Sequence, residues 1–254
     1  MKIGMILDAI YPSDARVTNE CEELIKDGHE VYLFCVSYQK NYIKSEIING
    51  IKVRRYYCSS LTYKLSALAN DFPFYSILMK SKIKDFVHKN NIDRMHIHDI
   101  QIAKAAVAIC KKYNLKYTLD LHENRHEIMK SYKHVNSFLG KLLISVKRWK
   151  KAEEKYVSKA EKIIVVTNQA KKELTERCKI SNDNVVVYPN TVRKSFYQNK
   201  DYDQELKKKY ANNYVLLYIG NTSERRGLDT VLDSMISLAK EVPEIKLIII
   251  GKSS

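Results

Sequence analysis

The sequence predicts an α/β fold: an open, doubly wound parallel sheet, followed by the start of a second unit of the same kind. Short apolar runs alternate with amphipathic stretches of helical length along nearly the whole chain, and this alternation is typical of parallel βαβ units. Hydrophobic residues make up 45% of the chain, a normal globular value. No apolar run reaches the roughly 18–20 residues needed to cross a bilayer.

The first part of the chain contains most of the expected elements. Gly28 is a good stop for the first helix, Asn49-Gly50 suits the positive φ angles of a tight hairpin turn, and Pro73 can open a helix. Strands are expected over residues 2–8, 30–36, 94–98, 116–121, 162–167 and 184–188, with a hairpin over residues 47–53. Helices are expected over residues 15–27, 73–89, 100–113, 137–158 (a long helix) and 169–178.

A polar stretch beginning near Pro189 separates this part from a second one. A short charged helix is expected there over residues 204–210, followed by a strand over 214–219 and a turn over 220–227. A helix over 228–240 and a strand over 246–250 complete this part. One βαβ unit cannot bury both faces of a sheet, so we expect a second domain that has begun and is cut short. We therefore assign residues 1–190 to an N-terminal domain, residues 191–212 to a linker and residues 213–254 to the beginning of a C-terminal domain.

The chain is strongly basic, with 44 Lys and Arg against 29 Asp and Glu and a formal net charge of +15. Such a protein is drawn to polyanions, so nucleic acid, anionic lipid and phosphorylated substrates are candidate partners, with plain solubility as the alternative. No nucleic-acid-binding signature supports the first of these. The five cysteines are scattered without a CxxC pair, which favours buried thiols over disulfides or zinc. The N-terminus is typical of a strand rather than a signal peptide, so we expect a cytoplasmic protein.

The loop after the first strand is the first candidate site, because ligands bind such sheets at the carboxyl ends of the strands. Ser13 or Asp14 could cap the next helix and leave its N–H groups to face a phosphate or a sugar hydroxyl; a simple helix cap is the alternative. No GxGxxG dinucleotide fingerprint is present. Arg16 is the strongest candidate here, because a guanidinium can bind phosphate through two hydrogen bonds.

Two neighbouring strands end in polar residues, His96-Ile97-His98-Asp99 and Asp120-Leu121-His122-Glu123. Alternation along a strand puts His96 and His98 on the same face of the sheet. Three interpretations compete: strand ends satisfied by the backbone, a metal site, or a rim that hydrogen-bonds to sugar hydroxyls. Ligands from two strands without tight spacing make the metal site the weakest of these. The sugar-binding rim is favoured for His122, with His98 and Asp99 as further candidates.

Residues 130–162 hold ten Lys and Arg against three Glu. Apolar residues fall there at helical spacing: Phe138, Leu139, Leu142, Leu143, Val146 and Trp149. A helix of this kind can lie on an anionic membrane surface, with its apolar groups in the lipid and its lysines on phosphates. The preferred alternative is an ordinary helix that buries its apolar stripe in the core.

The loop between Gly220 and Gly227 follows a strand and leads into a helix, and it contains Arg225 and Arg226. A glycine-bounded loop with two arginines at a helix start can hold a diphosphate, and a charged surface loop is the alternative. The GK[ST] ending of a P-loop is missing.

Taken together, these segments resemble glycosyltransferase family 4, a family of retaining enzymes with the GT-B fold. The matching segments in chain order are Leu24-Ile25-Lys26-Asp27-Gly28-His29-Glu30-Val31, His96-Ile97-His98-Asp99, Leu121-His122-Glu123, Val165-Val166-Thr167 with Lys171-Lys172-Glu173-Leu174, Val185-Val186-Val187-Tyr188-Pro189-Asn190, Ile219-Gly220 with Arg226-Gly227-Leu228, and Ile249-Ile250-Gly251. Their order over nearly the whole chain carries the resemblance.

The resemblance implies two Rossmann-like domains facing across a cleft, with the acceptor on the N-terminal domain and a nucleotide sugar, such as a UDP- or GDP-sugar, on the C-terminal domain. It implies retaining transfer to a saccharide or lipid-linked acceptor, in cell-surface polysaccharide or glycoconjugate biosynthesis, with no metal or other cofactor. Arg226 would neutralise the charge that develops on the leaving diphosphate. The assigned roles are catalytic for His122, donor-binding for Gly220, Arg225 and Arg226, and acceptor-binding for Asp14, Arg16, His98 and Asp99.

The sequence departs from the family pattern in several places. Asn221 stands where a second basic residue is usual, and Thr191 replaces the usual Gly after Pro189-Asn190. The family's acidic EX7E element is absent, so we expect the chain to be inactive alone. A non-catalytic transferase-like binding module and half of a split enzyme are the alternatives, and peripheral attachment to the inner face of the membrane is a further expectation.

Overall fold

The computed structural model describes residues 1–192, 194–198 and 202–251. The chain divides into two compact units, Met1–Thr191 and Val192–Ser254, and each unit has its own sheet.

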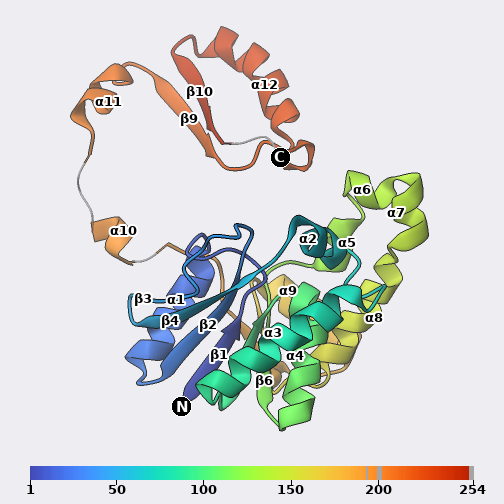
Figure 1. The fold of residues 1–254 in the computed structure, drawn as a ribbon. Coiled ribbons are helices and arrows are strands. Elements are labelled where there is room, and N and C mark those ends of the chain that lie inside the picture. The colour runs from blue at the N-terminus through green and yellow to red at the C-terminus, as the bar shows by residue number, and fades with distance from the viewer. Residues whose placement is uncertain (193, 199–201, 252–254) are drawn as a thin grey trace. The chain divides into compact units, whose positions relative to one another are not determined.

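An eight-stranded sheet forms the centre of the first unit, in the order β3-β4-β2-β1-β5-β6-β7-β8 (Figure 1). All neighbouring strands are parallel except β3 and β4, which form the antiparallel hairpin predicted at Asn49-Gly50. The strands are β1 (Lys2–Ile6), β2 (Glu30–Ser37), β3 (Ser45–Ile48), β4 (Ile51–Tyr57), β5 (Arg94–His98), β6 (Lys116–Leu121), β7 (Lys162–Val165) and β8 (Val185–Val187).

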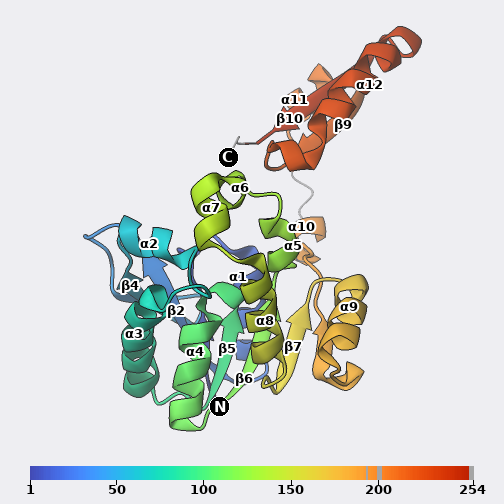
Figure 2. The same cartoon turned by 90° about the vertical axis from the view of Figure 1, so that its right-hand side faces the viewer.

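Helices cover both faces of this sheet, which confirms the predicted α/β fold. They are α1 (Ala15–Lys26), α2 (Ser60–Ser66), α3 (Phe74–Asn90), α4 (Ile100–Tyr113), α5 (Arg125–Met129), α6 (Lys133–Asn136), α7 (Phe138–Leu143), α8 (Val146–Val157) and α9 (Asn168–Cys178). Figure 2 shows α3, α4 and α8 side by side on one face. Successive side chains of β1 point to opposite faces of the sheet and belong to two different hydrophobic cores. Met5 lies in one core with Val17 of α1, and Ile6 lies in the other with Phe86 of α3.

The prediction of one long helix over residues 137–158 is wrong. The chain forms α7 and α8 instead, with a break at Ile144, which is extended, and Ser145, which caps α8 by accepting a hydrogen bond from the Arg148 N–H. Asp71 fixes the break from a distant loop, since it accepts hydrogen bonds from the Ser145 N–H and the Trp149 indole N–H, both at 3.0 Å. Serine and aspartate side chains thus replace the backbone bonds of a continuous helix.

The second unit contains a two-stranded parallel sheet of β9 (Tyr214–Ile219) and β10 (Ile245–Ile250), joined by α12 (Leu228–Glu241). Two short helices, α10 (Lys194–Gln198) and α11 (Gln204–Lys209), precede this βαβ unit. Among its described residues, Leu228 is the one hydrophobic residue that is buried. Nowhere in the described chain does a helix have both the length and the apolar character needed to span a membrane.

Candidate functional site

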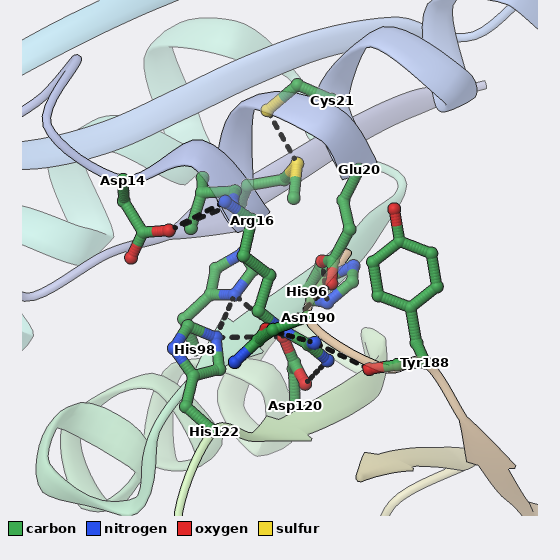
Figure 3. A network of polar contacts seen from close by, with 12 residues as sticks. Asp14, Arg16, Glu20, Cys21, His96, His98, Asp120, His122, Tyr188 and Asn190 are labelled. Carbon is green, nitrogen blue, oxygen red and sulfur yellow. Dashed lines mark hydrogen bonds and ion pairs between the residues drawn. The ribbon is translucent and has the colours of Figure 1, made fainter. Parts of the chain in front are cut away.

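Polar side chains from two strands and one helix meet at the carboxyl edge of the eight-stranded sheet (Figure 3). His98 ends β5 and lies in register with Asp120 of the neighbouring strand β6, and His122 follows two residues later. Arg16 comes from the first turn of α1, which follows the adjacent strand β1. The parallel order of the strands therefore collects these four side chains, which we call the Asp120 cluster.

Asp120 is completely buried, and its carboxylate is the centre of this cluster. Arg16 donates from Nη2 to Oδ1 at 2.7 Å and from Nε to Oδ2 at 3.0 Å, which is the bidentate arrangement that favours a strong charge-assisted pair. Oδ2 also lies 2.9 Å from His122 Nε2 and 3.2 Å from His98 Nδ1. Burial raises the pKa of Asp120, but the hydrogen bonds from His122, His98 and Arg16 outweigh it and hold the pKa well below its ordinary range.

Arg16 also binds the chain segment that follows β8. Its Nη1 donates to the Tyr188 carbonyl oxygen at 2.6 Å and to Asn190 Oδ1 at 3.1 Å, and the guanidinium lies 5.0 Å from the centre of the Tyr188 ring. Asp14 caps α1 by accepting hydrogen bonds from the N–H groups of Arg16 and Val17, at 3.0 and 3.2 Å. The cap fixes where the helix starts, and with it the position of Arg16.

Glu20 and His96 extend the cluster inward, and the sequence interpretation did not include Glu20. Its carboxyl group lies 3.2 Å from Arg16 Nε and 3.3 Å from His96 Nε2. Burial and the nearby Asp120 raise the pKa of Glu20 to about 8, whereas burial and the neighbouring His98 lower the pKa of His96 to about 3. Both groups are therefore mainly uncharged at pH 7. The His96 and His98 rings stack with centroids 4.6 Å apart, which confirms that they share one face.

His122 is the member of the cluster that reaches the surface. Its side chain is 17% exposed, against 1% for His98 and none for Asp120. Burial lowers the pKa of His122, but the hydrogen bond and negative charge of Asp120, with the charge of Asp99, outweigh burial and raise the pKa to about 9. An imidazolium held by a buried carboxylate therefore faces the carboxyl edge of the sheet at neutral pH.

Asp99 connects β5 to α4 in an uncommon backbone conformation, with φ of +67° and ψ of 153°. This φ/ψ combination is strained for a non-glycine residue, and such strain clusters at active sites and ligand-binding segments. The N–H of Asp99 donates to the Asp120 carbonyl oxygen at 2.8 Å, which holds this conformation in place. Burial raises the pKa of Asp99, against the lowering effect of the His122 and Arg125 charges.

Four side chains of this region could together reach a metal ion: Glu20, His96, His98 and Asp120 have ligand atoms within 4.8 Å of one another. The Arg16 guanidinium, however, already binds both Asp120 oxygens and lies beside Glu20. Arg16 thus already brings positive charge to Asp120, and the absence of a metal ion from this site stays a prediction.

A second candidate region lies in the second unit, at the carboxyl ends of β9 and β10. The Gly220 carbonyl packs against Gly251 so closely that a Cβ atom at residue 251 would collide with it. The turn Glu224–Arg226 and Gly227, at φ of +68°, lead from this corner into the N-terminus of α12. Backbone N–H groups at such a helix start can bind an anion.

The comparisons with known proteins identify the family. Residues 15–196 match the model of Glycosyltransferase Family 4, which is well over half of the chain. The chain belongs to glycosyltransferase family 4. No curated protein sequence matches it.

Solved structures show that this family 4 chain has the GT-B fold. A sucrose-phosphate synthase from Thermosynechococcus elongatus is similar with a TM-score of 0.73 at 15% identity, over 100% of this chain and 63% of the other. An E. coli structure described as trehalose-6-phosphate bound with UDP-2-fluoro glucose gives 0.70 at 13% identity, over 100% and 65%. Anabaena HepE in complex with UDP and glucose gives 0.62 at 15%, over 100% and 62%. The chain thus spans less than two thirds of the length of each of these structures.

The predicted site residues fall into two groups. The structure brings Arg16, His98 and His122 together around Asp120, with Asp14 and Asp99 fixing the backbone beside them. The Arg16 guanidinium hydrogen-bonds to other protein groups, and His98 does so through Nδ1 while its buried Nε2 has no hydrogen-bond partner among the described residues. Their predicted contact with an acceptor stays a prediction. Gly220 and Arg226 lie in the second unit, and the side chain of Arg225 lies outside the part of the structure that is described.

Proposed function

We propose that this family 4 chain contains the acceptor-side unit and the beginning of the donor-side unit of a retaining, nucleotide-sugar-dependent glycosyltransferase. The observation that carries the proposal is the Asp120 cluster, which presents His122 at the carboxyl edge of the sheet in a chain of this family. The similar structures that hold UDP-2-fluoro glucose, or UDP and glucose, support a nucleotide sugar as the donor.

In this proposal His122 binds the donor sugar. Its Nε2 is bonded to Asp120, so the ring orientation is set and Nδ1 is the atom that we assign to a sugar oxygen. The raised pKa of about 9 keeps the ring a hydrogen-bond donor with a positive charge at neutral pH. A fixed positive charge beside the reaction centre stabilises negative charge that develops on the leaving group.

We assign the donor diphosphate to the corner formed by Gly220 and Gly251, next to the start of α12. Arg226 lies in the turn just before this helix and is exposed, and Arg225 is its neighbour in sequence. Two guanidinium groups and free N–H groups at a helix N-terminus can together neutralise a diphosphate without a metal ion. The close Gly220–Gly251 contact leaves no room for a side chain at residue 251.

We assign the acceptor to a cavity of about 520 Å³ in the first unit. Gln101 of α4 and Arg125 of α5 reach it from the segments that follow β5 and β6, next to Asp99 and His122 in sequence. Aromatic side chains form much of the remaining wall, including Tyr63, Tyr132, His134 and Trp149. Aromatic faces with a few amide and guanidinium donors suit a saccharide, either free or lipid-linked. We further propose that the enzyme acts at the cytoplasmic face of the membrane, in the assembly of cell-surface polysaccharides or glycoconjugates.

Calorimetry and transfer assays test this function on the protein expressed from its entire reading frame, with UDP, GDP and their sugars. We expect binding of one nucleotide family and turnover that His122→Ala reduces by about 100-fold or more. His88→Ala, on the exposed side of α3, is the matched control and should keep full activity.

Absence of binding to every nucleotide would count against the proposal and favour a non-catalytic binding module. We expect the 254-residue chain by itself to show no turnover, because it spans 63% of the sucrose-phosphate synthase that it is similar to. Turnover restored by a separate complementing chain would identify half of a split enzyme.

A further inference from the structure

Helix α7 presents large apolar side chains to solvent. The exposed fractions are 85% for Phe138, 64% for Leu139, 73% for Leu142 and 40% for Leu143. These positions are related by steps of one and four residues, so they share one side of the helix. An ordinary surface helix places its apolar side in the core, and contiguous exposed apolar residues mark an interaction surface.

Helix α7 packs against α6, which is anchored in the core of the first unit. Gly140 packs against the backbone of His134, where no side chain would fit, and Val135 is buried in the main core. Ser137 caps α7 by accepting a hydrogen bond from the Gly140 N–H at 3.1 Å. Gly140 and Val135 are therefore the inward positions of this segment, and the four large side chains of α7 are its outward ones.

The sequence on either side of α7 is rich in basic residues. Residues 130–151 contain seven Lys and Arg and no Asp or Glu. Lys133, Lys141, Lys147 and Lys151 are all exposed. A surface that combines exposed apolar residues with an excess of lysines is complementary to the headgroups and upper acyl chains of anionic lipids.

The basic character continues along the helix layer that contains α8 (Figure 2). A groove of about 730 Å³ between α3, α4 and α8 is lined by six lysines and one glutamate. Those residues are Lys80, Lys104, Lys111, Lys116, Lys155, Lys159 and Glu161. Helix α8 thus carries lysines from its start beside α7 to its end in this groove, which extends the attraction to a surface rich in phosphate.

We propose that α7 inserts into the surface of an anionic lipid bilayer, with Phe138, Leu139, Leu142 and Leu143 among the acyl chains and the lysines of α6 to α8 on lipid phosphates. Tyr132 and His134, which line the proposed acceptor cavity, lie at the start of α6, the helix that precedes α7 in the chain. If the proposed function holds, this membrane contact brings the cavity to a lipid-linked acceptor. The membrane contact itself does not depend on sugar transfer.

Sedimentation with vesicles tests the contact on the 254-residue chain. We expect binding to phosphatidylcholine–phosphatidylglycerol vesicles of about 3:1 composition and little binding to phosphatidylcholine alone. F138S/L142S should lower the partition coefficient by about tenfold or more. I43S/I47S, which removes two other exposed isoleucines of the same unit, should leave it unchanged. K141E/K147E should also lower it by about tenfold, and K40E/K44E should have little effect.

Fluorescence gives a second measurement that does not depend on sedimentation. Trp149 is buried and is the single tryptophan, so its emission should not respond to vesicles. Phe138→Trp should add a component that shifts to the blue when anionic vesicles are present. Wild-type protein that ignores anionic vesicles at low salt would overturn the proposal. Vesicle binding by F138S/L142S equal to that of wild type would also overturn it. A third contrary outcome is a wild-type dimer that binds no vesicles and that F138S/L142S converts to a monomer, because α7 would then bind a second copy of the chain.

Discussion

Asp120 has no exposure to solvent, yet its carboxylate stays charged because Arg16 and two imidazoles surround it. A buried ion pair adds little net stability compared with apolar residues of the same size, but removing one partner leaves the other charge buried alone. The Asp120 cluster is therefore a point at which a small chemical change has a large structural effect.

Asp120→Asn should lower the free energy of unfolding by about 3–5 kcal/mol, because Arg16 loses its buried counter-charge while the shape of the side chain is kept. Urea unfolding followed by circular dichroism measures this change. Glu23→Gln is the control, since it breaks the exposed pair with Lys26 at 2.6 Å and should have a much smaller effect. Equal effects of the two substitutions would show that the Arg16–Asp120 pair does not form in solution.

The raised pKa of His122 predicts a pH-dependent contribution to stability. The pKa rises from the ordinary 6.5 to about 9 in the folded protein. A base with a raised folded pKa contributes its full stabilisation below about pH 6.5 and loses it as the pH rises through about 9. The difference in unfolding free energy between wild type and His122→Gln should therefore shrink between pH 6.5 and 9.5, as measured by urea unfolding at each pH. A difference that stays constant over this range would contradict the His122–Asp120 contact.

At this scale the sequence analysis named Arg16, His98 and His122, which the structure brings together, but it did not assign a role to Asp120 at their centre. Strand alternation placed His96 and His98 on one face, and the structure confirms it. Glu20 could have been found, because it lies one helical turn after Arg16. The pairing of Arg16 with Asp120 spans 104 positions and depends on which strands are neighbours, so no local pattern contains it.

At the scale of elements, strands and helices with a strong period were predicted well. The bounds of β5, α4, β6 and β9 agree with the prediction, since turn residues or charged residues flank each apolar run. The short helices α2, α5 and α6 were not predicted, because one or two turns are too short to show a period. The α7–α8 break was missed because it depends on Asp71, which is far away in sequence.

Gly140→Ala should destabilise the α6–α7 segment, because its methyl group would meet the His134 carbonyl. We expect a loss of about 1–3 kcal/mol, as for other small-to-large changes at packed positions. Hydrogen exchange followed by mass spectrometry should show faster exchange over residues 133–143. Ser158→Ala, at the exposed end of α8, is the control, and equal exchange in both variants would mean that Gly140 has room for a side chain.

At the scale of the whole molecule, the two units differ in how much core they contain. Both hydrophobic cores consist of residues of the first unit, whereas Leu228 is the buried hydrophobic residue in the described part of the second. A two-stranded sheet with one helix covers only one of its faces, and in the described part of this unit it buries a single hydrophobic residue. Stability of the chain should therefore reside in Met1–Thr191.

Deletion of residues 192–254 should leave the urea midpoint of the first unit almost unchanged, because neither hydrophobic core loses a residue. The separate fragment 192–254 should show no cooperative transition. Circular dichroism of both fragments and of the whole chain measures these outcomes. A clear fall in the midpoint of fragment 1–191 would show that the second unit supports the first.

The strand order β3-β4-β2-β1-β5-β6-β7-β8 also matters for synthesis. β1 lies inside the sheet and leaves the ribosome first; β2 and then β4 extend one side, and β5, β6, β7 and β8 extend the other in the order of translation. Apart from β3, which pairs with β4 two residues later, every strand of the nascent polypeptide finds its neighbour already made. The first unit can thus assemble outward as it is translated, without a long interval in which a central strand lacks both partners.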